Sequence, residues 1–316
     1  MTASTDQDAA TSDIFRRYGI FIAFALILLV LSIASPDFRR PRNFANILRQ
    51  SSVHGVMAVG MTFVILTAGI DLSVGSLLAL AGVLCAGAAH AGAPPVVAIM
   101  AALGVGAVAG LLNGLVITKG RVTPFVVTLG MMSVARGLGH IYTDGRPISG
   151  FSDSMRWAGA GHILGIPVPV VVFVIVVLAA FVVLRRTTFG RYVYAIGSNE
   201  TAARLTGLRV DAVKIAVYAL CGLTAALGAV IEIARLNAAE SIAGVGYELD
   251  VIASVVIGGT SLMGSRGGVI GTFVGALLIG TINNGMNLLE VSPYWQLVAK
   301  GAIIVAAALL DRLREH

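Results

Sequence analysis

The chain has 316 residues, of which 57% are apolar and only 12% are charged, and its mean hydropathy is +0.91. A water-soluble domain carries about 25% charged residues, so this composition excludes a soluble globular protein. The net charge of +6 comes from basic residues set between apolar runs, which favours membrane loops over a nucleic-acid-binding arm.

The first fifteen residues are polar and include Asp6, Asp8 and Asp13. A secretory signal peptide begins with positive charge and has a shorter apolar core than the run that follows here. We therefore expect a disordered cytoplasmic tail over 1–15. We expect 16–316 to form a single transmembrane domain that retains its first span.

Apolar stretches recur along the rest of the chain, and about 20 such residues suffice to cross a bilayer as a helix. They predict an all-α polytopic membrane protein with about ten transmembrane helices. The expected spans lie near 18–35, 52–69, 72–90, 96–116, 122–142, 166–184, 212–234, 250–263, 268–288 and 294–311. The segments around Asp71 and Ser265 are either loops or breaks within the membrane.

Lysine and arginine near the ends of the spans predict that both termini are cytoplasmic, because cytoplasmic loops are the more basic. The supporting residues are Arg16, Arg17, Lys119, Arg121, Arg185, Arg186, Arg191, Arg204, Arg209, Lys214, Arg312 and Arg314. Four arginines fall instead on the expected outer side, namely Arg39, Arg40, Arg42 and Arg49. They either anchor at lipid headgroups or contact an outer partner.

A carboxylate, two hydroxyls and two glycines interrupt a long apolar run at 69–76. An aspartate inside a membrane usually faces protein, water or a partner charge, so Asp71, Ser73 and Gly75 are candidates for a substrate pathway. Alternatively, Asp71 caps the helix that follows. The two roles are compatible if the cap lies beside the pathway.

A weak internal repeat links the fourth and ninth spans. An Asn-Gly pair and a following Pro occur at Asn113 and Pro124, and again at Asn284 and Pro293. The two copies lie five spans apart, and successive spans cross the membrane in alternate directions. The copies therefore run in opposite directions, which is typical of transporters. The amides of Asn113, Asn284 and Asn287 are therefore pathway candidates, although amides also hold helices together.

The glycine-dense segment 257–268 lacks the lysine of a phosphate-binding loop. It predicts a tight connection or a re-entrant turn. The cytoplasmic loop, about 186–211, contains a pattern for a short helix that Ser198 or Asn199 caps at its start and Gly207 ends. Glu200 and Arg204 have the spacing of an ion pair. This helix either meets a partner or is a solvated loop.

The five histidines are scattered without the spacing of metal ligands, and the sequence contains no nucleophile triad or Walker motif. We therefore expect no catalytic residue, metal or cofactor, and any ATPase activity must belong to another subunit.

Four stretches, 59–81, 191–216, 246–273 and 283–297, resemble the permease subunits of carbohydrate-uptake ABC transporters. The resemblance implies a bacterial inner-membrane protein with a fold similar to that of the vitamin B12 importer. It implies a homodimer, cytoplasmic ABC ATPase subunits and a periplasmic sugar-binding protein, with ribose as the favoured sugar. Another pentose, a hexose, a nucleoside or a furanosyl signal is the alternative within this class.

The resemblance also implies roles for individual residues. The loop matches the coupling helix that contacts the ATPase, through Gly197, Asn199, Glu200, Ala202, Ala203, Arg204 and Gly207. Arg39, Arg40 and Arg42 are the expected docking residues for the binding protein.

An ion-coupled secondary sugar transporter is the competing class. It would need an intramembrane carboxylate such as Asp71 or Glu232. Glu232 lies one turn from Arg235.

Overall fold

The computed structural model describes residues 21–313, so the expected tail at 1–15 lies outside the described residues. The helices are 21–34, η1 (Asp37–Arg39), α2 (Pro41–Leu66), α3 (Val74–His90), α4 (Pro95–Lys119), α5 (Pro124–Thr143), α6 (Asp153–Ala160), α7 (Val168–Arg186), α8 (Thr188–Ser198), α9 (Glu200–Leu205), α10 (Val210–Leu236), α11 (Tyr247–Ile257), α12 (Val269–Leu288) and α13 (Pro293–Leu313). Strands β1 (Ile148–Ser149) and β4 (Ala238–Ala239) pair antiparallel, as do β2 (His162–Ile163) and β3 (Ile166–Pro167).

Proline explains where several of the long helices begin. Pro41, Pro95, Pro124 and Pro293 each occupy the first position of a helix. The fixed φ of proline suits this position. Proline also lacks an N–H, which costs nothing here because an N–H at the first position has no partner within the helix. In the described part of the chain, α4, α7, α10 and α12 are long and apolar enough to cross a membrane. The chain is therefore a multi-pass membrane protein.

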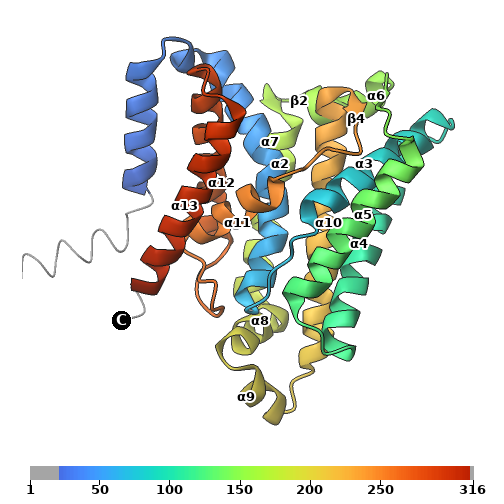
Figure 1. The fold of residues 1–316 in the computed structure, drawn as a ribbon, viewed down its shortest axis with the longest axis vertical. Helices are drawn as coiled ribbons and strands as arrows, with labels where there is room; N and C mark the ends of the chain where they lie inside the picture. Colours follow the sequence, from blue (N-terminus) through green and yellow to red (C-terminus); the bar gives the residue numbers. More distant parts are fainter. Residues whose placement is uncertain (1–20, 314–316) are drawn as a thin grey trace, which may run out of the picture.

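The long helices α2 and α10 lie in the middle of the bundle, with α3, α4 and α5 on one side and α11, α12 and α13 on the other (Figure 1). The pairing of α4 with α10 is especially close. Gly106, Gly110 and Gly114 are spaced by four on α4, and a Cβ on any of them would clash with the backbone of α10. Small residues at this spacing let two membrane helices approach within backbone contact.

The helices α4 and α12 run in opposite directions, as the internal repeat predicts. Lys119, at the end of α4, forms an ion pair with Asp211 at the start of α10. The loop before α12 lies at the same end of the molecule, where it contacts α8 through a bond from the Tyr194 hydroxyl to the Gly267 carbonyl. Thus α4 ends where α12 begins, and α2–α5 and α10–α13 form two oppositely oriented halves.

Two expected spans differ from the structure. The helix α2 begins at Pro41, well before the expected residue 52. The hydropathy pattern misses the first turns of this helix because they are polar. The expected span at 250–263 is wrong in its bounds: α11 has 11 residues and ends at Ile257. At about 1.5 Å per residue, α11 covers roughly half of a bilayer core of about 30 Å.

Candidate functional site

Asp71 lies in the turn between α2 and α3 and is fully buried. Its Oδ1 accepts hydrogen bonds from the backbone N–H of Ser73 at 2.9 Å and from the Ser73 hydroxyl at 2.6 Å. Asn113 Nδ2, on α4, donates to the same hydroxyl at 3.1 Å. The carboxylate therefore stabilises the turn from which α3 begins, and three of the six pathway candidates, Asp71, Ser73 and Asn113, lie together.

Gly75, in the first turn of α3, packs against Gly244 in the loop that precedes α11. A Cβ on either glycine would clash with the carbonyl oxygen of the other, and Gly244 has a left-handed φ of 71°. The first turn of α3 thus meets the loop leading into α11 inside the bundle. Irregular backbone at this depth is tolerated where it is buried or lines a cavity, as in the broken helices of transporters.

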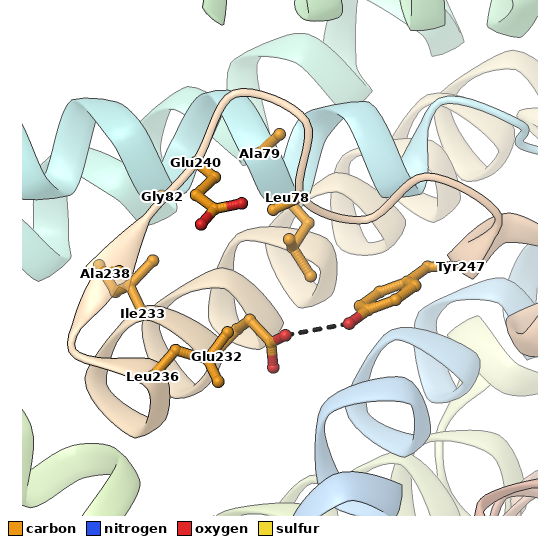
Figure 2. A pocket seen from close by; sticks show the side chains of 10 residues that line it. Leu78, Ala79, Gly82, Glu232, Ile233, Leu236, Ala238, Glu240 and Tyr247 are labelled. Atoms are coloured by element: carbon orange, nitrogen blue, oxygen red, sulfur yellow. Dashed lines mark hydrogen bonds between the residues drawn. The ribbon is translucent and has the colours of Figure 1, made fainter. Parts of the chain in front are cut away.

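The loop 237–246 lines a cavity of about 390 Å³ between α3, α10 and α11 (Figure 2). The volume falls within the range of small-molecule sites. Its apolar wall combines with two carboxylates, Glu232 and Glu240, and the hydroxyl of Tyr247. The lining residues are Leu78, Ala79, Gly82, Glu232, Ile233, Leu236, Ala238, Glu240, Ala243 and Tyr247.

Glu232 is buried at the cavity wall, and two partners hold it in place. The Tyr247 hydroxyl donates to its Oε1 at 3.0 Å, as Figure 2 shows, and Arg235 Nη2 donates to its Oε2 at 2.9 Å. Arg235, one turn along α10 from Glu232, therefore forms an ion pair with it. Each carboxylate oxygen has a second lone pair, so Glu232 can also accept a hydrogen bond from a ligand hydroxyl.

A second buried carboxylate, Asp250, was missed by the sequence interpretation. Its Oδ2 accepts from Lys300 Nζ at 2.9 Å and from Asn283 Nδ2 at 3.2 Å, and lies 3.6 Å from His54 Nε2. These partners come from α13, α12 and α2. The imidazole of His54 packs against the ring of Tyr247, with centroids 4.3 Å apart, so this group continues the polar wall of the cavity.

The signal for Asp250 is an internal similarity. The pattern Gly-Ile-Asp-Leu-Ser at 69–73 is echoed by Gly-Tyr-Glu-Leu-Asp at 246–250. Both patterns lie where an irregular segment leads into a helix inside the bundle. In this pairing Glu248 takes the place of Asp71 and Asp250 that of Ser73, so a search for a second copy of the Asp71 motif would have found the segment that contains Asp250.

The other asparagines make contacts elsewhere. Asn284 and Asn43 exchange hydrogen bonds at 2.9 and 3.0 Å, which joins α12 to α2. Asn287 is exposed, and its Oδ1 accepts from Gln296 at 2.9 Å. In the described part of the chain, the cavity wall includes none of the six pathway candidates.

The loop 186–211 contains the capped helix that the sequence predicts. Asn199 Oδ1 accepts from the backbone N–H of Ala202 at 2.9 Å, and Glu200 pairs with Arg204 at 2.8 Å. Gly207, with a φ of 83°, follows α9. Ala202 is exposed, but Ala203 is buried against the protein, so only part of the expected contact face is available to a partner.

An ion-pair network, which we call the α9 network, joins this helix to α4 and α10. Arg204 lies 2.7 Å from Asp211, Lys119 lies 3.0 Å from Asp211, and Lys214 lies 3.0 Å from Glu200. The sequence showed only the local pair within α9. The network fixes the loop to two helices that extend through the bundle.

The charges of the α9 network affect one another. Partial burial tends to raise the pKa of Glu200, but bonds from Arg204 and Lys214 outweigh it and hold that pKa below its usual value. Lys119 and then Arg204 lower the pKa of Asp211. Because both folded-state pKa values are depressed, the stabilisation is present above about pH 4 and is lost as the pH falls through the lowered values.

The three outlying arginines, Arg39, Arg40 and Arg42, are exposed where the chain enters α2. The start of α2 lies at the end of the bundle opposite α9 (Figure 1). Arg40 forms an ion pair with Asp37 at 2.9 Å. Arg49, close by, makes a contact of 2.8 Å with His162 of β2. This end of the molecule therefore presents a basic surface next to the short strands.

Broken helices that meet inside an apolar bundle, a part-polar cavity and a charged loop at one end together define a membrane permease. The chain belongs to the family described as the permease component of branched-chain amino acid transport systems, whose model matches residues 43–308. The chain is 49% identical to the ribose import permease of Escherichia coli K12, over 93% of each chain. It is also 49% identical to the ribose import permease of Bacillus subtilis 168, over 95% of this chain and 94% of the relative.

A third relative is the D-allose transport system permease of Escherichia coli K12, which is 40% identical over 94% of this chain and 92% of its own length. No solved structure matches the chain. The resemblance to sugar-uptake ABC permeases is confirmed.

Proposed function

We propose that this chain is the membrane subunit through which a bacterial ABC importer moves ribose into the cytoplasm. The observation that carries the proposal is the identity of 49% to ribose import permeases from two distant bacteria, over more than nine-tenths of the chain. The identity falls to 40% for the allose permease and to 36% for the galactose and methyl galactoside permease of Escherichia coli K12. Ribose is therefore the favoured sugar.

The proposed assembly is a homodimer of this chain in the inner membrane, with about ten spans per subunit, both termini in the cytoplasm, and a fold similar to that of the vitamin B12 importer. An ABC ATPase binds at the loop about 186–211, within the membrane domain 16–316. A periplasmic sugar-binding protein docks at Arg39, Arg40 and Arg42. The exposure of these arginines opposite α9 supports this arrangement.

We place the sugar, on its way inward, in the cavity lined by Glu232, Glu240 and Tyr247. A neutral polyol donates hydroxyl hydrogens to carboxylates, while its C–H faces pack on an apolar wall. Asp71, Ser73, Gly75 and Asn113 then shape the turn where α3 begins, beside this cavity. Asn284 and Asn287 support the pathway by joining helices and chain segments around it.

Transport proceeds by alternating access in this proposal. A conformational change requires contacts that differ between two states, and ATP binding to the partner subunits supplies them. The ATPase moves the loop 186–211, and the loop moves the membrane helices. The bound sugar needs only weak contacts, because a tight site would slow its release.

The purified chain, reconstituted alone in liposomes, should show no concentrative uptake of labelled ribose. Adding its ATPase and binding protein should produce uptake that requires ATP. Accumulation driven by a proton or sodium gradient without ATP would overturn the proposal. Competition by unlabelled allose and galactose in the same system would test the choice of sugar.

The cavity can be tested in the same liposomes with Glu240→Gln, and with Glu290→Gln as a control on another exposed loop. Glutamine keeps an acceptor oxygen but loses the charge, and a hydrogen bond to a charged group is stronger than a neutral one by about 1–1.5 kcal/mol. Glu240→Gln should therefore slow uptake about five- to tenfold at saturating binding protein. Equal uptake by the two variants would remove Glu240 from the pathway.

A further inference from the structure

Three segments that are far apart in the sequence meet at the inner end of α2. The carbonyl of Leu66, in the last turn of α2, accepts a hydrogen bond from the backbone N–H of Ser265 at 3.1 Å. Gly197, in the last turn of α8, packs against both residues. A Cβ on Gly197 would clash with the Leu66 carbonyl oxygen and would lie 2.7 Å from the nitrogen of Ser265. We call this contact of Leu66, Gly197 and Ser265 the α8 junction.

The junction lies next to backbone in uncommon conformations. Ala68 and Ser265 have left-handed φ values of 55° and 65°, which residues with a side chain rarely adopt. Gly264, with a φ of 87°, packs so closely that a Cβ on it would lie 3.0 Å from the nitrogen of Ala68. Such conformations persist where the surrounding contacts enforce them, and they cluster in segments that switch.

The helix α8 contacts the same loop at a second point. The hydroxyl of Tyr194, one turn before Gly197, donates to the carbonyl of Gly267 at 2.9 Å. The helix is therefore fixed at Tyr194 and at Gly197 to the loop 258–268, and at Gly197 to the end of α2. These are contacts to backbone, without a long flexible side chain on the loop side.

The two membrane segments at the junction are the two breaks in the bundle. The end of α2 leads directly into the turn that contains Asp71, and the loop 258–268 separates α11 from α12. Closely packed groups transmit a displacement because they have little room to be compressed. A movement of α8 therefore moves both breaks together, whereas the α9 network reaches α4 and α10 instead.

We propose that Gly197 is a positioning residue that passes the movement of the cytoplasmic loop to both breaks at once. This inference rests on the proposed function, in which an ATPase moves that loop. It changes the expected role of Gly197, which faces the membrane domain and does not serve as an ATPase contact. Only glycine lets α8 approach the Leu66 carbonyl so closely.

The test uses the complete transporter in liposomes and measures the ATP hydrolysed per ribose taken up. The variants are Gly197→Ala and Tyr194→Phe. Their matched controls lie outside the loop 186–211: Gly130→Ala, where a Cβ would meet no atom within 4 Å, and Tyr294→Phe, at an exposed tyrosine. Uptake by the unmodified chain is measured first, so a failure of the proposed function is seen separately from a failure of the junction.

Gly197→Ala should raise the ATP hydrolysed per ribose at least tenfold, while the ATPase still co-purifies with the chain. Tyr194→Phe should raise it about threefold, and both controls should keep the original ratio. An unchanged ratio in Gly197→Ala, or an equal loss in the controls, would overturn the proposal. If Gly197→Ala fails to accumulate in the membrane, Tyr194→Phe decides, and an unchanged ratio in that variant would overturn it.

Discussion

Asp71 and Asp250 are both buried carboxylates near the start of a helix that begins inside the bundle, yet they are held in different ways. The Oδ1 of Asp71 is bonded to Ser73, two residues along the chain. Asp250 is bonded or paired to side chains from three other helices, including the ammonium group of Lys300. Similar turn sequences have therefore produced a local turn-forming contact in one half and a long-range anchor in the other.

The difference affects what each carboxylate stabilises. Asp71 fixes the conformation of its own turn, and α3 is also held by wide packing against α4, α5 and α10. The helix α13 packs chiefly against α11, so the pair of Asp250 with Lys300 is a major part of its attachment. The two halves are thus related in direction but not in what the buried carboxylate of each half stabilises.

The largest effect is expected for Lys300→Met. This change leaves the buried charge of Asp250 without its cation, and breaking a buried ion pair in this way costs about 3–5 kcal/mol. Thermal unfolding of the purified protein in detergent should show the loss. The double variant Asp250→Asn with Lys300→Met should recover most of it, because it removes both charges. Equal stability of Lys300→Met and the original chain would show that α13 is held by apolar packing alone.

A smaller effect is expected at Asp71. Asp71→Leu leaves the backbone N–H of Ser73 without its acceptor, at a cost of about 1–3 kcal/mol, and should block ribose uptake while the protein stays in the membrane. Asp71→Asn keeps an acceptor oxygen and should be nearly silent, because an amide caps about as well. Uptake and membrane levels measured together would separate these outcomes. Loss of uptake in Asp71→Asn would show that the negative charge itself is needed.

The smallest effect on stability is expected for an exposed ion pair, Arg40 with Asp37. Arg40→Ala should change the free energy of unfolding by less than about 1 kcal/mol, because water and salt screen the pair. Reversal of Arg39, Arg40 and Arg42 to glutamate should instead slow uptake, most strongly at low binding-protein concentration and low salt. Labelling of an Arg40→Cys variant only by a reagent on the cytoplasmic side would contradict both the docking role and the topology.

The sequence predicted the features that depend on neighbouring residues. The capped start of α9 and the pair of Glu200 with Arg204 follow from spacing along a single helix, and both are confirmed, with Asn199 as the one of the two candidate caps that the structure uses. The partners of Asp250 could not be predicted, because His54 and Lys300 are brought to it only by the packing of α2 and α13. The short length of α11 was missed because apolar residues continue into the loop, at Leu262 and Met263, and blur the end of the helix.

The short length of α11 has a consequence for the distance that the protein must seal. Tyr247, its first residue, lines the cavity, and the outer part of the same path is a loop instead of a helix. In the proposed pathway, a solute that has reached Tyr247 has therefore already passed roughly half of the insulating layer. Under the proposed function, the gate then needs to close only the remaining thickness, at the ends of α2 and α11 nearest the loop 186–211.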